Sequence, residues 1–104
     1  MATVTEIASG VYRINVVLPD RPVSYSLFLV DDASPTLIET SFSAVFDEVK
    51  MAVESVVDLN KIERIVVPHF EGDECGGLND FLAAAPNSVA VCSPIGSSSI
   101  RDFT

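Results

Sequence analysis

The sequence predicts an α/β domain in which a mixed β-sheet carries helices on at least one face. The first 40 residues consist of apolar runs broken by turn residues, which is typical of successive antiparallel strands. Apolar residues then recur every three or four positions, the period of an amphipathic helix. Further on, a second helical stretch separates two short apolar runs, and strands joined through a helix need a crossover connection. Part of the sheet should therefore be parallel.

Four strands are expected before the first helix. Residues 4–17 contain two of them, joined by a Ser-Gly turn. Residues 23–30 form the third, in which alternate apolar side chains share one face. Residues 36–39 form the fourth, and the Asp, Ser and Pro of residues 31–35 predict the turn of a second hairpin.

Residues 44–57 predict an amphipathic helix. The apolar positions that recur at the helical period are Phe46, Val49, Val53, Val56 and Val57. Charged residues occupy the other side of this helix. Ser43 is the expected N-cap, and Asp47 and Glu48 lie early in the helix, where its dipole favours negative charge.

The rest of the chain predicts a strand, a helix and a last strand. Residues 62–67 are a nearly continuous apolar run rich in β-branched residues, which suits a strand buried on both faces. Pro68 ends this strand, because proline donates no ladder hydrogen bond. Residues 78–85 predict a short helix, and residues 87–92 predict the final strand.

Composition excludes several classes of partner. Fifteen acidic and six basic residues give a formal net charge of −9, and no basic cluster is available for nucleic acid or an anionic membrane. The longest uncharged stretch, residues 81–100, contains prolines, a glycine and serines, and is not expected to span a bilayer. The N-terminus lacks a secretory signal, and two cysteines make no disulfide framework. A cytoplasmic protein is expected.

The chain is rich in apolar residues for its size. Hydrophobic residues make up 48% of 104 positions, and the mean hydropathy is +0.39. So small a domain has little interior in which to bury them. Either the sheet is covered on both faces, or a partner surface completes it.

The only histidine lies in the segment VVPHFEGDECGGL, residues 66–78, between a predicted strand and a predicted helix. His69, Glu71 and Asp73 are spaced by two, so in an extended segment they point to the same side. Open α/β sheets bind ligands outside the carboxyl ends of their strands. One imidazole with carboxylates suits iron or manganese better than an all-histidine or thiolate zinc site. The alternative is a solvated acidic turn.

Other candidate sites are weaker. Cys75 lies among carboxylates that disfavour its thiolate, and Cys92 is expected to pack as a small hydrophobe. The nucleophile elbow G-x-S-x-G is absent, and the glycine-rich segment has no lysine for phosphate.

The H-x-E-x-D pattern, followed by Gly-Gly and a helix, resembles the metal loop of the metallo-β-lactamase superfamily. Its glutamate resembles the flavodiiron and oxygen-binding diiron branch. EIASGVYRI is similar to the superfamily's opening hairpin, and SYSLFLVDD with TLIET is similar to the next one. The resemblance implies the N-terminal half of an αββα sandwich, with residues 1–104 forming a single partial domain.

The resemblance also implies roles for individual residues. His69 and Glu71 would bind the first metal, and Asp73 would bind the second metal and act in catalysis. Glu74 stands where the family has a histidine ligand, and would coordinate as a carboxylate. Glu39 stands where the family usually has an aspartate near the site. The remaining ligands of the family come from its second half.

Three functions are compatible with these residues. The first is a non-haem diiron module, with two iron ions, that binds or reduces dioxygen or nitric oxide with electrons supplied from elsewhere. The second is a hydrolase, with zinc as another possible metal, in which Asp73 orients a metal-bridging water. The third is a non-catalytic structural or assembly fragment. The expected partners are a small-molecule or gas ligand, with either a second copy in a homo-oligomer or the missing C-terminal half.

Overall fold

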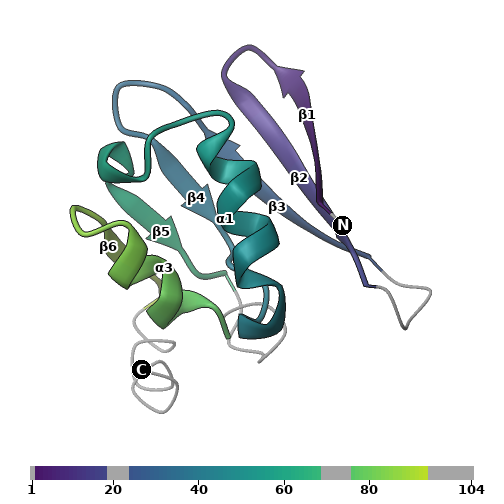
Figure 1. Cartoon of the computed structure of the whole chain (residues 1–104). Coiled ribbons are helices and arrows are strands. Elements are labelled where there is room, and N and C mark those ends of the chain that lie inside the picture. Colours follow the sequence, from purple (N-terminus) through teal and green to yellow (C-terminus); the bar gives the residue numbers. More distant parts are fainter. Residues whose placement is uncertain (1, 19–23, 69–75, 94–104) are drawn as a thin grey trace.

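The computed structural model describes residues 2–18, 24–68 and 76–93. In this part of the chain, six strands form one sheet in sequence order, and two α-helices pack on one of its faces (Figure 1). The strands are β1 (Ala2–Ala8), β2 (Val11–Val17), β3 (Ser24–Val30), β4 (Thr36–Ile38), β5 (Arg64–Val66) and β6 (Val89–Val91). The α-helices are α1 (Phe46–Glu54) and α3 (Leu78–Ala84), and the 3-10 turns are η1 (Ser43–Val45) and η2 (Leu59–Lys61).

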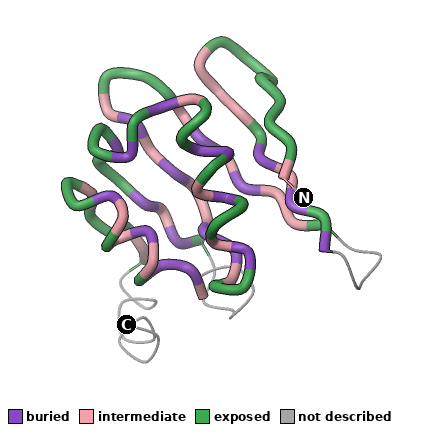
Figure 2. The backbone as a smooth tube through the Cα atoms, in the orientation of Figure 1, coloured by how far each residue is buried: buried purple, intermediate pink, exposed green. Residues whose placement is uncertain are grey.

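The sheet is mixed, as predicted. Strands β1 to β4 pair antiparallel with their neighbours, whereas β4, β5 and β6 pair in parallel. Helix α1 lies in the connection from β4 to β5, and α3 lies in the connection from β5 to β6. Strand β1 forms one edge and is exposed along nearly all of its length (Figure 2).

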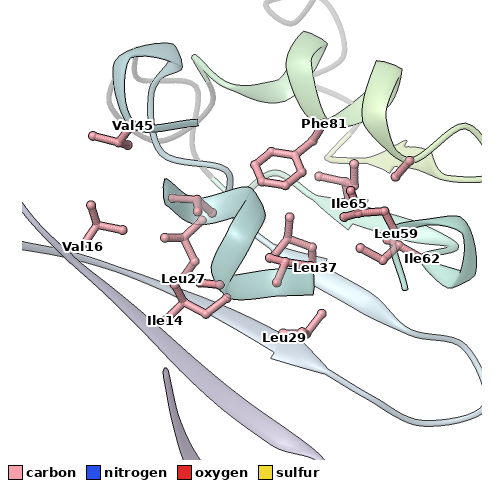
Figure 3. Close-up of a cluster of buried hydrophobic side chains, with 14 of the residues drawn as sticks. Ile14, Val16, Leu27, Leu29, Leu37, Val45, Leu59, Ile62, Ile65 and Phe81 are labelled. Carbon is pink, nitrogen blue, oxygen red and sulfur yellow. The ribbon is translucent and has the colours of Figure 1, made fainter. Parts of the chain in front are cut away.

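The core lies between the sheet and the two helices. Alternate residues of the strands face the helices and are almost completely buried: Ile14, Val16, Leu27, Leu29, Leu37 and Ile65. Val49 and Val53 of α1 belong to the same buried cluster. Phe81 of α3 lies over these strand residues (Figure 3). The ring of Phe81 meets that of Phe46 edge-on, with centroids 4.9 Å apart. The two helices therefore share one core with a single face of the sheet.

The opposite face of the sheet has no helix over it in the described part of the chain (Figure 1). Strand register aligns Phe28, Ile38, Val66 and Val91 in a row across β3 to β6. The first three are half-buried, and Val91 is 39% exposed. One sheet face thus presents a continuous apolar row.

The first helix differs from its prediction at both ends. Ser43 does not cap it: α1 begins at Phe46, after the turn η1, and the Ser43 hydroxyl donates to the Gly76 carbonyl at 2.9 Å. The helix ends at Glu54, where the chain enters a turn with a hydrogen bond between residues three positions apart. The amides of Val56 and Val57 both donate to the Val53 carbonyl.

The strand predicted over residues 62–67 is shorter and less buried than expected. Strand β5 spans Arg64–Val66, with Arg64 exposed and Val66 half-buried. The prediction of burial on both faces was therefore wrong, since in the described part of the chain the helices cover one side of the sheet. Residue Glu39 was also placed in a strand, but β4 ends at Ile38.

Neither α-helix in the described residues has the length and apolar character that crossing a membrane requires.

Candidate metal centre

The predicted ligands occupy a segment that the structure frames from both sides. His69, Glu71, Asp73 and Glu74 lie outside the described residues, as does Cys75. The described chain reaches residue 68 after β5 and resumes at residue 76 before α3. The two flanks of this segment, and the elements that contact them, define where it begins and ends in the fold.

The flank after β5 lies beside the segment that follows β4. Strands β4 and β5 are parallel, and Ile38 pairs with Val66. The carboxyl ends of both strands therefore lie side by side, at the same end of the sheet. The Glu39 amide donates to the Val66 carbonyl at 2.9 Å. On the other side, the Val67 amide donates to the Val91 carbonyl at 2.9 Å, which joins β6 to the same edge. Open α/β sheets bind ligands at this position, outside the carboxyl ends of their strands.

The flank before α3 contacts the same segment, residues 39–43. The Gly77 amide donates to the Ser41 carbonyl at 2.9 Å, and the Ser43 hydroxyl donates to the Gly76 carbonyl at 2.9 Å. A Cβ atom on Gly77 would lie 3.1 Å from the Thr40 carbonyl oxygen, so the two backbones approach closely. Residues 39–43, which we name the bridging segment, therefore hold both ends of the predicted ligand loop.

The bridging segment has an unusual backbone and an unusual buried hydroxyl. Glu39 and Ser41 have φ angles of 70° and 60°, a left-handed conformation that side chains disfavour. Thr40 and Ser41 are 0% and 2% exposed. The Thr40 hydroxyl donates to the Ser41 carbonyl at 3.2 Å, whereas within the described residues the Ser41 hydroxyl has no hydrogen-bond partner. Strained backbone and unsatisfied buried groups concentrate at functional sites.

The described residues offer no competing metal site. No group of three or more His, Cys, Asp or Glu side chains comes together within residues 2–18, 24–68 and 76–93. Two surface hollows of the described residues lie away from the bridging segment. One is between β1 and α1, and the other is around Asp31, Lys61 and Asn87. Cys92 is half-buried and packs against the core, as a small hydrophobe does.

Sequence reasoning placed Glu39 near the site but missed Ser41 and the contact of Ser43 with Gly76. The available signal was the short polar run ETSFS, which directly follows a buried strand. Polar residues at the carboxyl end of a strand are candidates for a site in an α/β sheet.

No protein-family model matches the sequence. Among curated proteins, the chain is 28% identical over 81 residues to a flavo-diiron protein of Clostridium acetobutylicum, covering 78% of this chain and 20% of that protein. It is 38% identical over 72 residues to the anaerobic nitric oxide reductase flavorubredoxin of Pectobacterium atrosepticum, covering 66% and 14%. It is 30% identical over 73 residues to the rubredoxin-oxygen oxidoreductase of Megalodesulfovibrio gigas, covering 70% and 18%. The chain thus spans a fifth or less of these relatives.

Solved structures share the fold. A flavoprotein from Thermotoga maritima matches with a TM-score of 0.90 and 20% identity, over 99% of this chain and 30% of that one. The flavodiiron protein from Giardia intestinalis matches with a TM-score of 0.88 and 23% identity, over 99% and 28%. Rubredoxin oxygen:oxidoreductase from Desulfovibrio gigas gives 0.88 and 23%, over 96% and 28%. In sequence and fold, the chain is therefore a relative of the flavodiiron proteins and matches the N-terminal part of their metallo-β-lactamase-fold core.

Proposed function

We propose that this chain supplies part of a non-haem diiron site at which dioxygen or nitric oxide is bound and reduced. The observation that carries the proposal is the match to flavodiiron relatives over 66–78% of the chain. Two of those relatives are named for the reduction of nitric oxide or for oxygen oxidoreductase activity. The H-x-E-x-D segment lies within a frame that suits such a site.

The residues present fit iron by their chemistry. His69, Glu71 and Asp73 offer one imidazole and two carboxylates, and Glu74 offers a third carboxylate. Such nitrogen and oxygen donors match the ligand sets of non-haem iron. The buried Ser41 hydroxyl beside the loop's flank is a polar group that an occupied site could satisfy.

Each side chain would have a defined task. His69 and Glu71 would hold one metal ion, and Asp73 with Glu74 would hold the other. When bound, ferrous ions would supply electrons for reducing the gas, and the further electrons would come from a donor outside this chain. The negative charge of the carboxylates would favour the oxidised metal ions and so lower their reduction potential. Val67 and Leu78, at the two flanks of the loop, are buried in the hydrophobic core.

We propose that the uncovered sheet face receives the rest of the site, from a second β-sheet. The apolar row across β3 to β6 supports this, because sheets pack face to face through such side chains. On β2 to β6, the charged residues of this face are Arg13 and Arg64, although the whole chain carries −9. A second copy would bring like charges together, so a complementary half with acidic residues fits better than a homodimer.

We also propose a cytoplasmic location. The support is the small number of cysteines: the sequence has two, and Cys92 is free in the described part of the chain.

The proposed gas chemistry is tested by loading the chain with ferrous iron without oxygen, removing unbound metal, and then admitting air or nitric oxide. We expect a change in near-ultraviolet and visible absorption that is absent from the metal-free chain and weakened by Asp73→Ala. The proposal would be refuted if the absorption spectrum of the iron-loaded chain were the same before and after each gas is admitted.

A second assay, on the chain loaded with zinc instead of iron, distinguishes the hydrolase alternative from gas reduction. A zinc-loaded chain that hydrolyses a thioester, lactone or phosphoester, with activity lost in Asp73→Ala, would favour metal-bound hydroxide chemistry over gas reduction.

A further inference from the structure

We propose that the exposed side of strand β1 is a docking site for a partner protein, which adds an extended segment with the pattern basic-x-apolar-x-basic as a further strand of the sheet. The site consists of Ala2–Ala8 and the hollow between β1 and α1, and we name it the β1 edge. It lies outside the predicted metal centre, and the proposal does not depend on metal binding.

Strand β1 offers backbone groups along its outer side. It is seven residues long, lies at the end of the strand order and, within the described residues, pairs with β2 alone. Every residue of β1 after Ala2 is exposed (Figure 2). An edge strand directs a row of N–H and C=O groups away from its sheet, and an extended peptide can pair with them.

The β1 edge lacks most of the features that block an exposed strand. Proteins commonly block such strands with lysine, proline, a bulge or a very short strand. Strand β1 contains no lysine or proline, and its register irregularity is confined to the stretch from Glu6 to Ala8. Strand β6, at the other end of the order, is three residues long. Strand β1 is therefore better suited than β6 to pair with a further strand.

A hollow beside β1 can receive a side chain of the added strand. It measures about 370 Å³. The residues that line it are Ala2, Val4, Glu48, Met51, Ala52 and Ser55. Val4 points to the helix side of the sheet, because it pairs with the buried Ile14. Val4 is 36% exposed and Met51 is 71% exposed, so an apolar side chain at the centre of the added strand would bury apolar surface on both.

Acidic side chains lie at both ends of the hollow. Glu6 is two residues beyond Val4 and therefore shares its face of the sheet. The Glu6 carboxylate accepts the Gly10 amide at 3.2 Å, and a carboxylate can accept further hydrogen bonds. Glu48 lies in the first turn of α1, which is directed towards the start of β1 (Figure 1). Basic side chains at both ends of the added strand would complement these charges.

The spacing of these features sets the pattern of the partner segment. Side chains of a strand alternate between its faces, so those on the helix side are at positions i, i+2 and i+4. An apolar residue beside Val4 has its neighbours on that side beside Glu6 and Ala2, next to the two carboxylates. The pattern reads the same in both directions, so parallel and antiparallel addition are both compatible with it.

A second copy of this chain fits the β1 edge less well. Antiparallel pairing of two copies centred on Val4 would place Glu6 of each copy opposite Ala2 of the other, in the part of the hollow that Glu48 lines. Like charges would then meet at both ends, between chains that each carry −9. Charge complementarity therefore favours a basic segment of another protein.

The test is the binding of a fluorescently labelled peptide to the full chain. The probe contains the core Lys-Thr-Val-Thr-Lys, and a matched peptide contains Glu-Thr-Val-Thr-Glu. We expect the first peptide to bind and the second to bind at least about tenfold more weakly, because two charge pairs change sign. Amide hydrogen exchange in β1 should slow when the first peptide binds. Equal affinity of the two peptides, or no binding of the first, would overturn the proposal.

Variants of the chain locate the bound peptide. Glu6→Lys should weaken the binding of the basic peptide at least about fivefold and strengthen that of the acidic peptide. Glu63→Lys is the matched control, because it makes the same charge change at an exposed position just before β5. Met51→Lys, at an exposed position of α1, places a positive charge at the hollow and should also weaken the basic peptide, so it tests the site even if Glu6→Lys does not fold. Losses no larger than that of Glu63→Lys would overturn the location.

Two further measurements test strand addition and the choice of occupant. Two basic peptides are N-methylated on alternate amides, one on each set, and one of them should lose binding because only alternate amides face the edge. Unchanged binding of both would overturn strand addition. Analytical ultracentrifugation of the chain alone should find no dimer that Met51→Lys dissociates. Such a dimer would identify a second copy as the occupant and overturn the basic partner.

Discussion

At the scale of single residues, Gly10 shows how the first hairpin depends on a backbone that side chains avoid. Gly10 has a φ of 75°, and a Cβ there would lie 2.9 Å from the Asp31 carbonyl oxygen. We expect Gly10→Ala to lower the free energy of unfolding by about 1–2 kcal/mol or more, from the left-handed backbone alone. Urea unfolding measures this loss.

Gly77→Ala is the comparison for Gly10→Ala. Gly77 has a φ of −89°, and its added Cβ would lie 3.1 Å from the Thr40 carbonyl oxygen. Only a close contact opposes alanine there, so the loss should be smaller than at Gly10. Equal losses at both positions would contradict the role assigned to the Gly10 backbone.

Tyr12 gives a second prediction at this scale. The Glu6 carboxylate, with smaller contributions from burial, a hydrogen bond to Glu6 and the Asp31 charge, raises the pKa of Tyr12 above 10.0. The folded chain therefore holds this proton more tightly than the unfolded chain. Its contribution to stability is complete below about pH 10 and is lost as pH rises through the raised pKa.

Glu6→Gln tests the assignment. Without that negative charge, the pKa of Tyr12 should fall towards 10.0, which ultraviolet titration of the phenol detects. An unchanged Tyr12 titration would exclude Glu6 as the main cause.

At the scale of elements, helix α3 depends on one side chain. Phe81 is 0% exposed and packs edge-on against Phe46, which ties α3 to α1. Phe81→Ala should lower the free energy of unfolding by about 3–5 kcal/mol, because it leaves a cavity. This is a large part of the 5–15 kcal/mol typical of a domain. Chemical denaturation measures it.

Met51→Ala is the control for Phe81. Met51 lies on α1 but is 71% exposed, so its truncation should change stability by about 0.5 kcal/mol or less. If both variants lost similar stability, α3 would not be held by Phe81.

The elements also show what the sequence can and cannot predict. The hairpins, helix α1 and helix α3 were predicted because turn residues and apolar period are local properties. The length of β5 was not, since it follows from neighbours: β4 and β6 each pair over three residues. The Ser43 contact with Gly76 spans 33 positions and exists only once β4 and β5 pair. No local pattern contains such a contact.

At the scale of the whole molecule, the helices cover one face of the sheet and leave an apolar row on the other. This arrangement accounts for the high apolar content of the sequence without a larger core. The same topology brings the ends of β4, β5 and β6 to one edge, where the bridging segment frames the predicted ligand loop. The order of strand, loop and helix predicts a site at this end of the sheet, and that position stays a prediction. The burial of Ser41 beside it could not be predicted from the sequence.

The central claim is that His69, Glu71 and Asp73 hold iron in this chain, and the iron content of the purified protein tests it most directly. The chain is loaded with ferrous iron without oxygen, separated from unbound metal, and compared with a variant in which all three residues are alanine. The account predicts that the unmodified chain retains iron and the variant does not, with similar Tm values for the two metal-free proteins. Equal iron content in both, or none in either, would contradict it.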